Sequence, residues 1–121
     1  MRSQAQSVSN PRTEGQVNQR TKFTLALEFL KPITDAIRVG FKLYAQKQTA
    51  FNAAMSYTLA NAISGTSSSD YSLEYANALI SRGSLTSAAN GAATASSGNI
   101  VITWDDNSDV GSATSTDKAI I

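Results

Sequence analysis

The chain has 121 residues, enough for one ordinary domain or for two small elements that share a core. It contains no cysteine and no histidine, which excludes a disulfide framework, serine–histidine–acid catalysis and an ordinary zinc site. The net charge is +1, but residues 1–49 carry eight Lys or Arg against three Asp or Glu, whereas the remaining residues carry two against six. This asymmetry predicts a basic N-terminal part and an acidic C-terminal part.

The first helix is expected just after Asn10–Pro11–Arg12, because proline disfavours helix in the residue before it. Thr13 and Gln16 have the spacing of a capping box, which satisfies backbone N–H groups at a helix start. Pro32 interrupts the helical pattern that follows and predicts either a kink or a restart with Pro32 in the first turn of a second segment. Apolar residues recur at helical spacing on both sides of it: Phe23, Leu27, Leu30, Ile33, Ile37, Phe41 and Tyr44.

A further helix is predicted to begin at Thr49, an N-cap residue, and to end at Ser64–Gly65. Residues 1–65 would then form a helical hairpin, and the serine-rich residues 66–70 would mark the boundary to a second part. We expect Lys22, Arg38 and Lys47 to be exposed. The expected core consists of Phe23, Leu27, Leu30, Ile37, Phe41, Phe51, Met55 and Leu59.

After residue 70 the apolar period changes from about 3.6 to 2. Tyr71, Leu73 and Tyr75 share one parity, which predicts a half-buried strand. Residues 78–85 fit either a second strand or a short helix. Residues 87–97 are small and polar, and we interpret them as a loop.

The clearest strand pattern of the chain lies at Ile100, Ile102 and Trp104. A turn-rich acidic loop at residues 105–111 follows, and then a last strand at residues 116–121. We expect these two strands to pair antiparallel, with the three named side chains on the core face. The predicted fold class is therefore α+β: a helical segment, residues 1–65, followed by an incomplete antiparallel β-sandwich, residues 66–121.

One acidic motif resembles the start of a calcium loop. Asp105, Asn107 and Asp109 offer oxygen ligands at every second position. The match then fails, because Val110 stands where such a loop needs glycine and Thr116 where it needs the closing glutamate. We interpret the segment as an ordinary loop and assign no metal-binding residue.

The other charged and aromatic residues are also explained by surface solvation or core packing, without a functional site. Lys31, Asp35 and Arg38 have spacings that allow local pairing, which favours a solvated helix face over a nucleic-acid surface made of Arg12, Arg20, Lys22, Arg38, Lys42 and Lys47. Four acids are candidates for a catalytic pair of carboxylates, but their spacing does not require any two of them to share a cleft: Glu28, Asp35, Asp70 and Glu74. Apolar stripes, rather than a ligand platform, account for Phe23, Phe29, Phe41, Phe51 and Trp104. We assign no catalytic or cofactor-binding residue.

Several blocks of the sequence are similar to those of a known family: Asn10 to Glu14, Gln16, Gln19–Arg20, Lys22–Phe23, residues 29–32, 40–42, 49–55 and 81–83, and the segment around Trp104. On these residues the sequence resembles a family of uncharacterised proteins from Bacteroidetes bacteria. The resemblance implies a helical segment with an Asn-Pro-Arg-Thr start, a C-terminal immunoglobulin- or fibronectin-like β region, and further sequence at both ends. That start is also similar to a short motif in some phage structural proteins.

These observations predict a non-catalytic structural or interaction module of a surface, secreted or phage-related assembly. Its partner would be a protein or a second copy, since an open sheet edge at the end of the chain would favour association. The alternative is a nucleic-acid-binding protein that uses the basic helical half. We expect no enzyme activity, no cofactor and no membrane span, because no apolar run approaches the roughly 18 residues needed and the first twenty residues lack a signal-peptide core. The absence of cysteine leaves the compartment undetermined.

Overall fold

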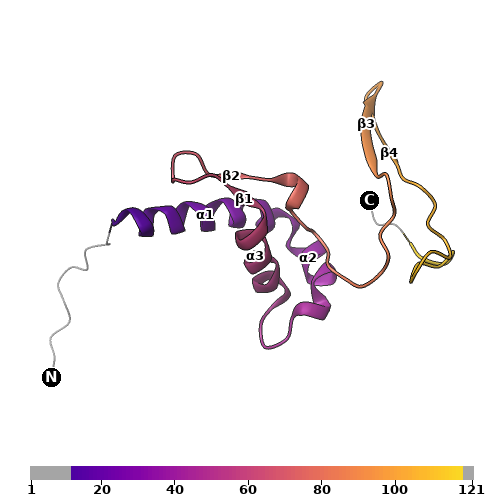
Figure 1. Cartoon of the computed structure of the whole chain (residues 1–121), viewed down its shortest axis with the longest axis horizontal. Helices are drawn as coiled ribbons and strands as arrows, with labels where there is room; N and C mark the ends of the chain where they lie inside the picture. The colour runs from indigo at the N-terminus through magenta and orange to yellow at the C-terminus, as the bar shows by residue number, and fades with distance from the viewer. Residues whose placement is uncertain (1–11, 119–121) are drawn as a thin grey trace. The chain divides into compact units, whose positions relative to one another are not determined.

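The computed structural model describes residues 12–118, and the chain divides into two compact units, Met1–Gly83 and Ser84–Ile121 (Figure 1). The first unit holds the helices and one small sheet, and the second holds another small sheet. The boundary expected at residues 65 and 66 falls inside the first unit, between two paired strands. The start at Asn10–Pro11 and the end of the expected last strand, residues 119–121, lie outside the described residues.

Local capping chemistry sets the helix starts of the first unit. Helix α1 (Glu14–Leu30) begins where the Gln16 side-chain oxygen accepts a hydrogen bond from the Thr13 backbone N–H at 3.2 Å. Pro32 lies in the first turn of a short 3₁₀ helix, η1 (Lys31–Ile33), and α2 (Thr34–Gly40) follows directly. The restart predicted from Pro32 is therefore confirmed.

The third helix, α3 (Ala50–Asn61), follows a second 3₁₀ turn, η2 (Lys42–Tyr44). Its predicted N-cap is confirmed, because Thr49 Oγ1 accepts a hydrogen bond from the Asn52 backbone N–H at 3.1 Å. The predicted end at Ser64–Gly65 is wrong: α3 stops at Asn61, and Ile63 lies in a strand. Strand pairing with residues distant in the sequence has overridden the helical spacing of Ile63.

Strands β1 (Ile63–Ser64) and β2 (Ser72–Leu73) form a two-stranded antiparallel sheet, with Ile63 opposite Leu73. Strand β2 is shorter than the strand that the Tyr71–Tyr75 pattern predicted, because a 3₁₀ turn, η3 (Tyr75–Asn77), begins at Tyr75. Residues 78–85 form neither the strand nor the helix that we considered. Their backbone instead follows α2, where the Arg82 N–H donates to the Gly40 carbonyl oxygen at 2.9 Å.

The core of the first unit lies between α1, α2 and α3, and its buried members are Ala26, Leu30, Ile37, Phe41, Ala53, Ala54 and Met55. Leu27, Phe51 and Leu59 are partly buried against it. Phe23 was expected in this core but is 47% exposed. In Figure 1, α3 lies beside the C-terminal part of α1.

The second unit is built on a β-hairpin of β3 (Ala92–Ser96) and β4 (Asn99–Thr103). The strand predicted around Ile100–Trp104 is confirmed, but its partner is β3, within the segment expected to be a loop. Residues 116–118 are not in a strand. The backbone of β3 supplies the ladder hydrogen bonds to the strong β-formers of β4. The small side chains of β3 gave no sign of this pairing in the sequence.

The prediction that the apolar residues of β4 face a core is wrong. Ile100, Ile102 and Trp104 are 75%, 40% and 45% exposed, and Val101 on the other face of the strand is exposed too. Parity places side chains on one face but does not supply a layer that covers it. Ala113 is the buried hydrophobic residue of the described part of this unit.

The fold class is α+β, as predicted: N-terminal helices with an incomplete β part of two two-stranded antiparallel sheets. No helix among residues 12–118 is both long enough and apolar enough to span a membrane.

Candidate functional site

The acidic segment that resembles a calcium loop is held by hydrogen bonds to residues 86 and 90, which precede it in the chain. Asp105 Oδ2 accepts from Asn90 Nδ2 at 2.6 Å, and Asn107 Nδ2 donates to the Thr86 carbonyl oxygen at 2.9 Å. Asp109 has a positive φ of 66°, a turn conformation. Within the described residues no group of three or more His, Cys, Asp or Glu is placed to hold a metal ion. These contacts fit the interpretation as a loop.

The four acids weighed as paired carboxylates lie on separate elements: Glu28 on α1, Asp35 on α2, Asp70 between β1 and β2, and Glu74 after β2. Asp35 binds Arg38 Nη1 at 2.9 Å, as their spacing predicted. Asp70 accepts hydrogen bonds from the backbone N–H groups of Thr66 and Ser67, at 3.2 Å and 2.6 Å, and from both hydroxyls.

These bonds stabilise the ionised form of Asp70, because each donor points at a carboxylate oxygen. The Ser67 hydroxyl is the largest cause, followed by the two backbone N–H groups, and together they lower the pKa of Asp70 from 3.8 to about 2. Asn18 Oδ1 on α1 accepts from the Ser68 N–H at 2.9 Å and so ties this loop to the helix. The site is a structural turn whose charge is already satisfied.

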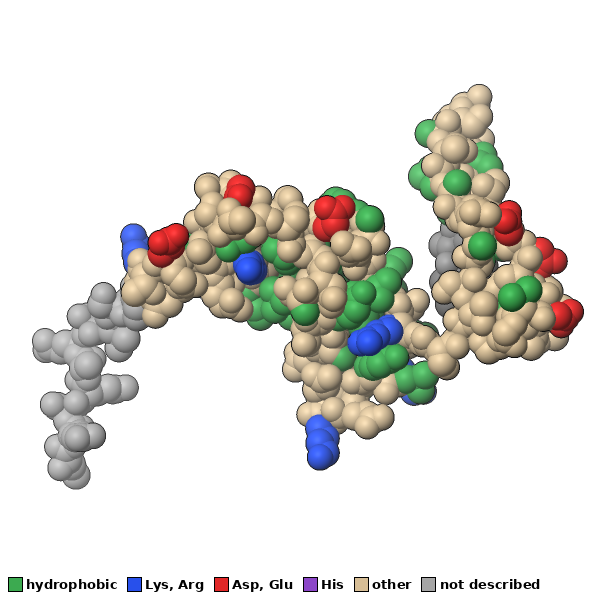
Figure 2. Space-filling view, in the orientation of Figure 1, with side chains coloured by type: hydrophobic (Ala, Val, Ile, Leu, Met, Phe, Trp, Pro, Cys, Tyr) green, Lys and Arg blue, Asp and Glu red, His purple; other side chains and the backbone are tan. Residues whose placement is uncertain are grey.

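The basic residues of the first unit are dispersed, and Figure 2 shows blue side chains at well-separated points of its visible face. The six that were weighed as a nucleic-acid surface precede α1, lie on α1 and α2, or lie in and after η2: Arg12, Arg20, Lys22, Arg38, Lys42 and Lys47. Arg38 is paired with Asp35, and Lys22 Nζ lies 4.7 Å from the centre of the Tyr71 ring. Lys22 is therefore half-buried, not exposed as predicted, whereas Arg38 and Lys47 are exposed.

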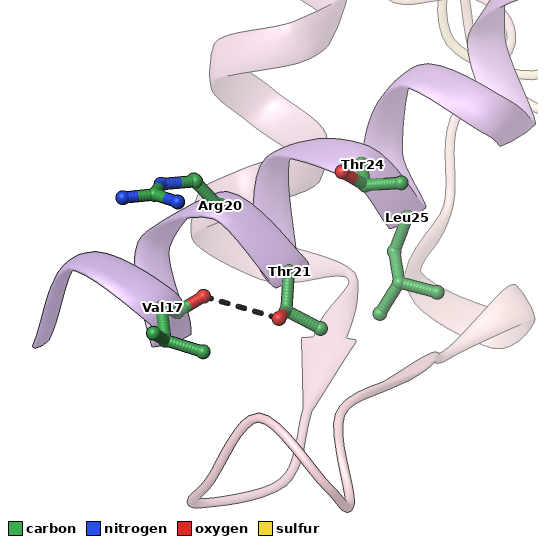
Figure 3. Close-up of a pocket in the computed structure, with 5 residues that line it drawn as sticks. All are labelled: Val17, Arg20, Thr21, Thr24 and Leu25. Carbon is green, nitrogen blue, oxygen red and sulfur yellow. Dashed lines mark hydrogen bonds between the residues drawn. The ribbon is translucent and has the colours of Figure 1, made fainter. Parts of the chain in front are cut away.

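A shallow, open hollow of about 370 Å³ runs along α1 (Figure 3). Val17, Thr21 and Leu25 follow one another at intervals of four residues and point to the same side of the helix, while Arg20 and Thr24 complete the lining. The Thr21 hydroxyl donates to the Val17 carbonyl oxygen at 3.1 Å, so its polar group is satisfied within the helix. The hollow is apolar, and nothing in it selects a particular ligand.

A second, open cavity of about 260 Å³ lies beside α3, and the exposed residue Arg82 lines part of it. The guanidinium carbon is 4.4 Å from the centre of the Tyr44 ring and 5.3 Å from that of Tyr57. Phe41 supports both rings, at centroid distances of 6.5 Å and 6.4 Å. The other lining residues are mostly small or amide-bearing: Gln48, Ala53, Ser56, Ala60 and Asn61. This cavity combines a cation, aromatic rings and hydrogen-bonding groups.

The sequence reasoning missed this cavity. It placed Tyr44 on an apolar stripe and counted Arg82 only as a base of the acidic part, whereas the structure brings together residues 40–44, 57 and 82. One signal pointed here: Gly40–Lys42 and Ser81–Gly83 both belong to the blocks that carry the family resemblance, and the two blocks are in contact.

Comparison with known proteins yields a family match. A protein-family model matches residues 1–121, and its description is that of a family of unknown function. No curated protein and no solved structure matches the chain.

Proposed function

We propose that this chain, which belongs over residues 1–121 to the DUF6266 family of unknown function, is a non-catalytic interaction module that joins protein chains in an assembly. The observation that carries the proposal is the β3–β4 hairpin, whose apolar strand β4 is exposed on both faces. Exposed contiguous apolar surface is typical of interaction sites. The resemblance to Bacteroidetes proteins and to phage structural proteins adds a surface, secreted or phage-related setting to the proposal.

The outer edge of β4 suits the addition of another strand. The turn residues Ser97 and Gly98 both have positive φ, which is the two-residue turn that favours a regular hairpin. Counting outward from this turn, Asn99, Val101 and Thr103 pair with β3 through hydrogen bonds, so the backbone groups of Ile100 and Ile102 point to the outer edge. A partner strand would complete these bonds.

The sequence of β4 favours a second copy as the partner. Asn99-Ile100-Val101-Ile102-Thr103 is nearly symmetric about Val101. If two copies pair antiparallel around a two-fold axis at Val101, then Ile100 of each faces Ile102 of the other, and Asn99 faces Thr103. Such pairs of β-branched residues are favourable in antiparallel sheets. The pairing would turn two hairpins into one four-stranded sheet, and sheets of more than two strands are more stable.

The test is sedimentation of the full chain over a range of concentrations. The parent chain is expected to associate as concentration rises. Ile102→Pro removes an outward N–H while leaving the bonds to β3, so this variant should stay monomeric. Ile102→Thr keeps both the N–H and the β-branch and should still associate. A parent chain that remains monomeric at millimolar concentration, or an Ile102→Pro variant that associates equally well, contradicts the proposal.

The charge distribution keeps nucleic-acid binding as the second candidate. The first unit has nine Lys or Arg against five Asp or Glu, a net charge of +4, whereas the second has a net charge of −3. Affinity for a fluorescent DNA or RNA probe should then fall steeply with salt. Absence of binding at low ionic strength would eliminate this candidate.

A further inference from the structure

We propose that Arg82, together with Tyr44 and Tyr57, forms a pocket that binds a carboxylate group of a peptide segment. This pocket lies in the first unit and is independent of the strand edge discussed above.

The guanidinium of Arg82 lies against two tyrosine rings. Its carbon Cζ is over the rings of Tyr44 and Tyr57, 4.4 Å and 5.3 Å from their centres. Contact with ring faces does not engage the N–H donors with an oxygen acceptor, so these donors stay available for a ligand. Two parallel N–H groups on one edge match the two oxygens of a carboxylate.

The charge of Arg82 has no ion-pair partner among residues 12–118, whereas Arg38 is paired with Asp35. The backbone N–H of Arg82 is bound to Gly40, which anchors the residue but leaves the guanidinium available. A cation beside a cavity and without a counter-charge attracts an anion.

Two amides and a hydroxyl also line the pocket. Gln48 Nε2 donates to the Tyr44 carbonyl oxygen at 3.3 Å, and Asn61 Nδ2 donates to the Tyr57 carbonyl oxygen at 2.9 Å. Each amide is thereby oriented and retains a second N–H donor. With the Ser56 hydroxyl, these groups offer hydrogen bonds to the backbone of a peptide that carries the carboxylate.

The pocket is also held in place before any ligand arrives. Gly40 lets the backbone of Ile80 and Ser81 approach so closely that a Cβ would collide with the Ile80 carbonyl oxygen and lie 2.8 Å from Ser81 Cα. This close approach fixes the segment that carries Arg82 against α2. A pre-positioned binding group loses less entropy when the ligand binds.

A carboxylate fits better than a phosphate because the pocket supplies one full positive charge. A phosphate monoester carries about two negative charges at neutral pH. Sites for phosphate usually combine more than one cation or a set of backbone N–H groups. The cavity volume of about 260 Å³ accommodates one side chain or one chain end.

The experiment uses the full chain and follows the Arg82 Nε–Hε resonance by NMR. The probes are N-acetyl-aspartate N-methylamide, N-acetyl-alanine, inorganic phosphate and the neutral N-acetyl-asparagine N-methylamide. We expect the two carboxylates to shift the resonance with a dissociation constant on the order of 1 mM, and the asparagine probe to leave it unchanged. The tighter of the two carboxylates identifies the source as a side chain or a chain end.

Two variants complete the test. Arg82→Lys keeps the charge but loses the fork, so binding, followed by the backbone resonances of Tyr57 and Asn61, should weaken about tenfold. Arg38→Lys is the matched control in the same unit and should bind as the parent does. The proposal is overturned if the parent chain responds to neither carboxylate. If Arg82→Lys then lowers only the stability, the role of Arg82 is to hold the fold together. A response to phosphate stronger than to the carboxylates would overturn it as well.

Discussion

Phe41 connects the core of the first unit to the Arg82 pocket. Its side chain is 1% exposed, and its ring touches those of Tyr44 and Tyr57. Phe51 was also expected in the core but is only partly buried. We expect Phe41→Ala to lower the free energy of unfolding by about 3–5 kcal/mol and Phe51→Ala by clearly less. Urea denaturation of both variants measures the difference, and equal losses would contradict this ranking.

Asp70 makes the turn between β1 and β2 sensitive to acid. Its pKa is lowered to about 2 by hydrogen bonds from Ser67 and Thr66, so the folded state holds the proton less tightly than the unfolded state. The stabilisation is complete above the ordinary pKa of 3.8 and is lost as the pH falls through about 2. The Tm difference between the parent and Asp70→Asn should therefore shrink between pH 4 and pH 2. A difference that stays constant over this range would exclude the mechanism.

At the level of elements, the packing of residues 80–82 against α2 depends on Gly40. A methyl group there would meet the Ile80 carbonyl oxygen and Ser81, so Gly40→Ala should lower the free energy of unfolding by about 1–3 kcal/mol. Gly15→Ala is the matched control, because it has open space around it within α1 and should be neutral or stabilising by about 0.5 kcal/mol. Thermal unfolding distinguishes them. If the two variants were equally stable, residues 80–82 would be able to move away from the added methyl group at little cost.

The helices could be predicted from the sequence, because their signals are local. Thr13 with Gln16, Pro32 and Thr49 each act on backbone groups within a few residues. The strands were harder: Ile63 has helical spacing, yet it pairs with Leu73. That choice depends on a partner ten residues away, which spacing alone does not identify.

The candidate site could not be predicted for a related reason. Arg82 becomes a pocket residue only when the chain returns to Gly40 and places the guanidinium over Tyr44 and Tyr57. Three separate stretches of sequence must meet, and none carries a motif. The exposure of Ile100 and Trp104 was missed because alternation assigns side chains to a face without saying whether anything covers it.

At the scale of the whole molecule, the two units should differ in local stability. The first unit has a core of buried residues from three helices. In the second unit, among residues 84–118, the buried hydrophobic residue is Ala113. In hydrogen exchange at low protein concentration, central amides of α3 should exchange at least about a hundredfold more slowly than those of β3 and β4. Mass spectrometry of peptic fragments measures this. Equal protection would mean that the units open together.

The aromatic residues give this division a spectroscopic counterpart. All four tyrosines, Tyr44, Tyr57, Tyr71 and Tyr75, belong to the first unit, and the single tryptophan, Trp104, is an exposed residue of the second. Excitation at the red edge of the absorption band, where tyrosine does not absorb, therefore reports on the second unit alone, whereas tyrosine emission comes from the first unit alone. The chain carries its own pair of optical labels, one for each unit.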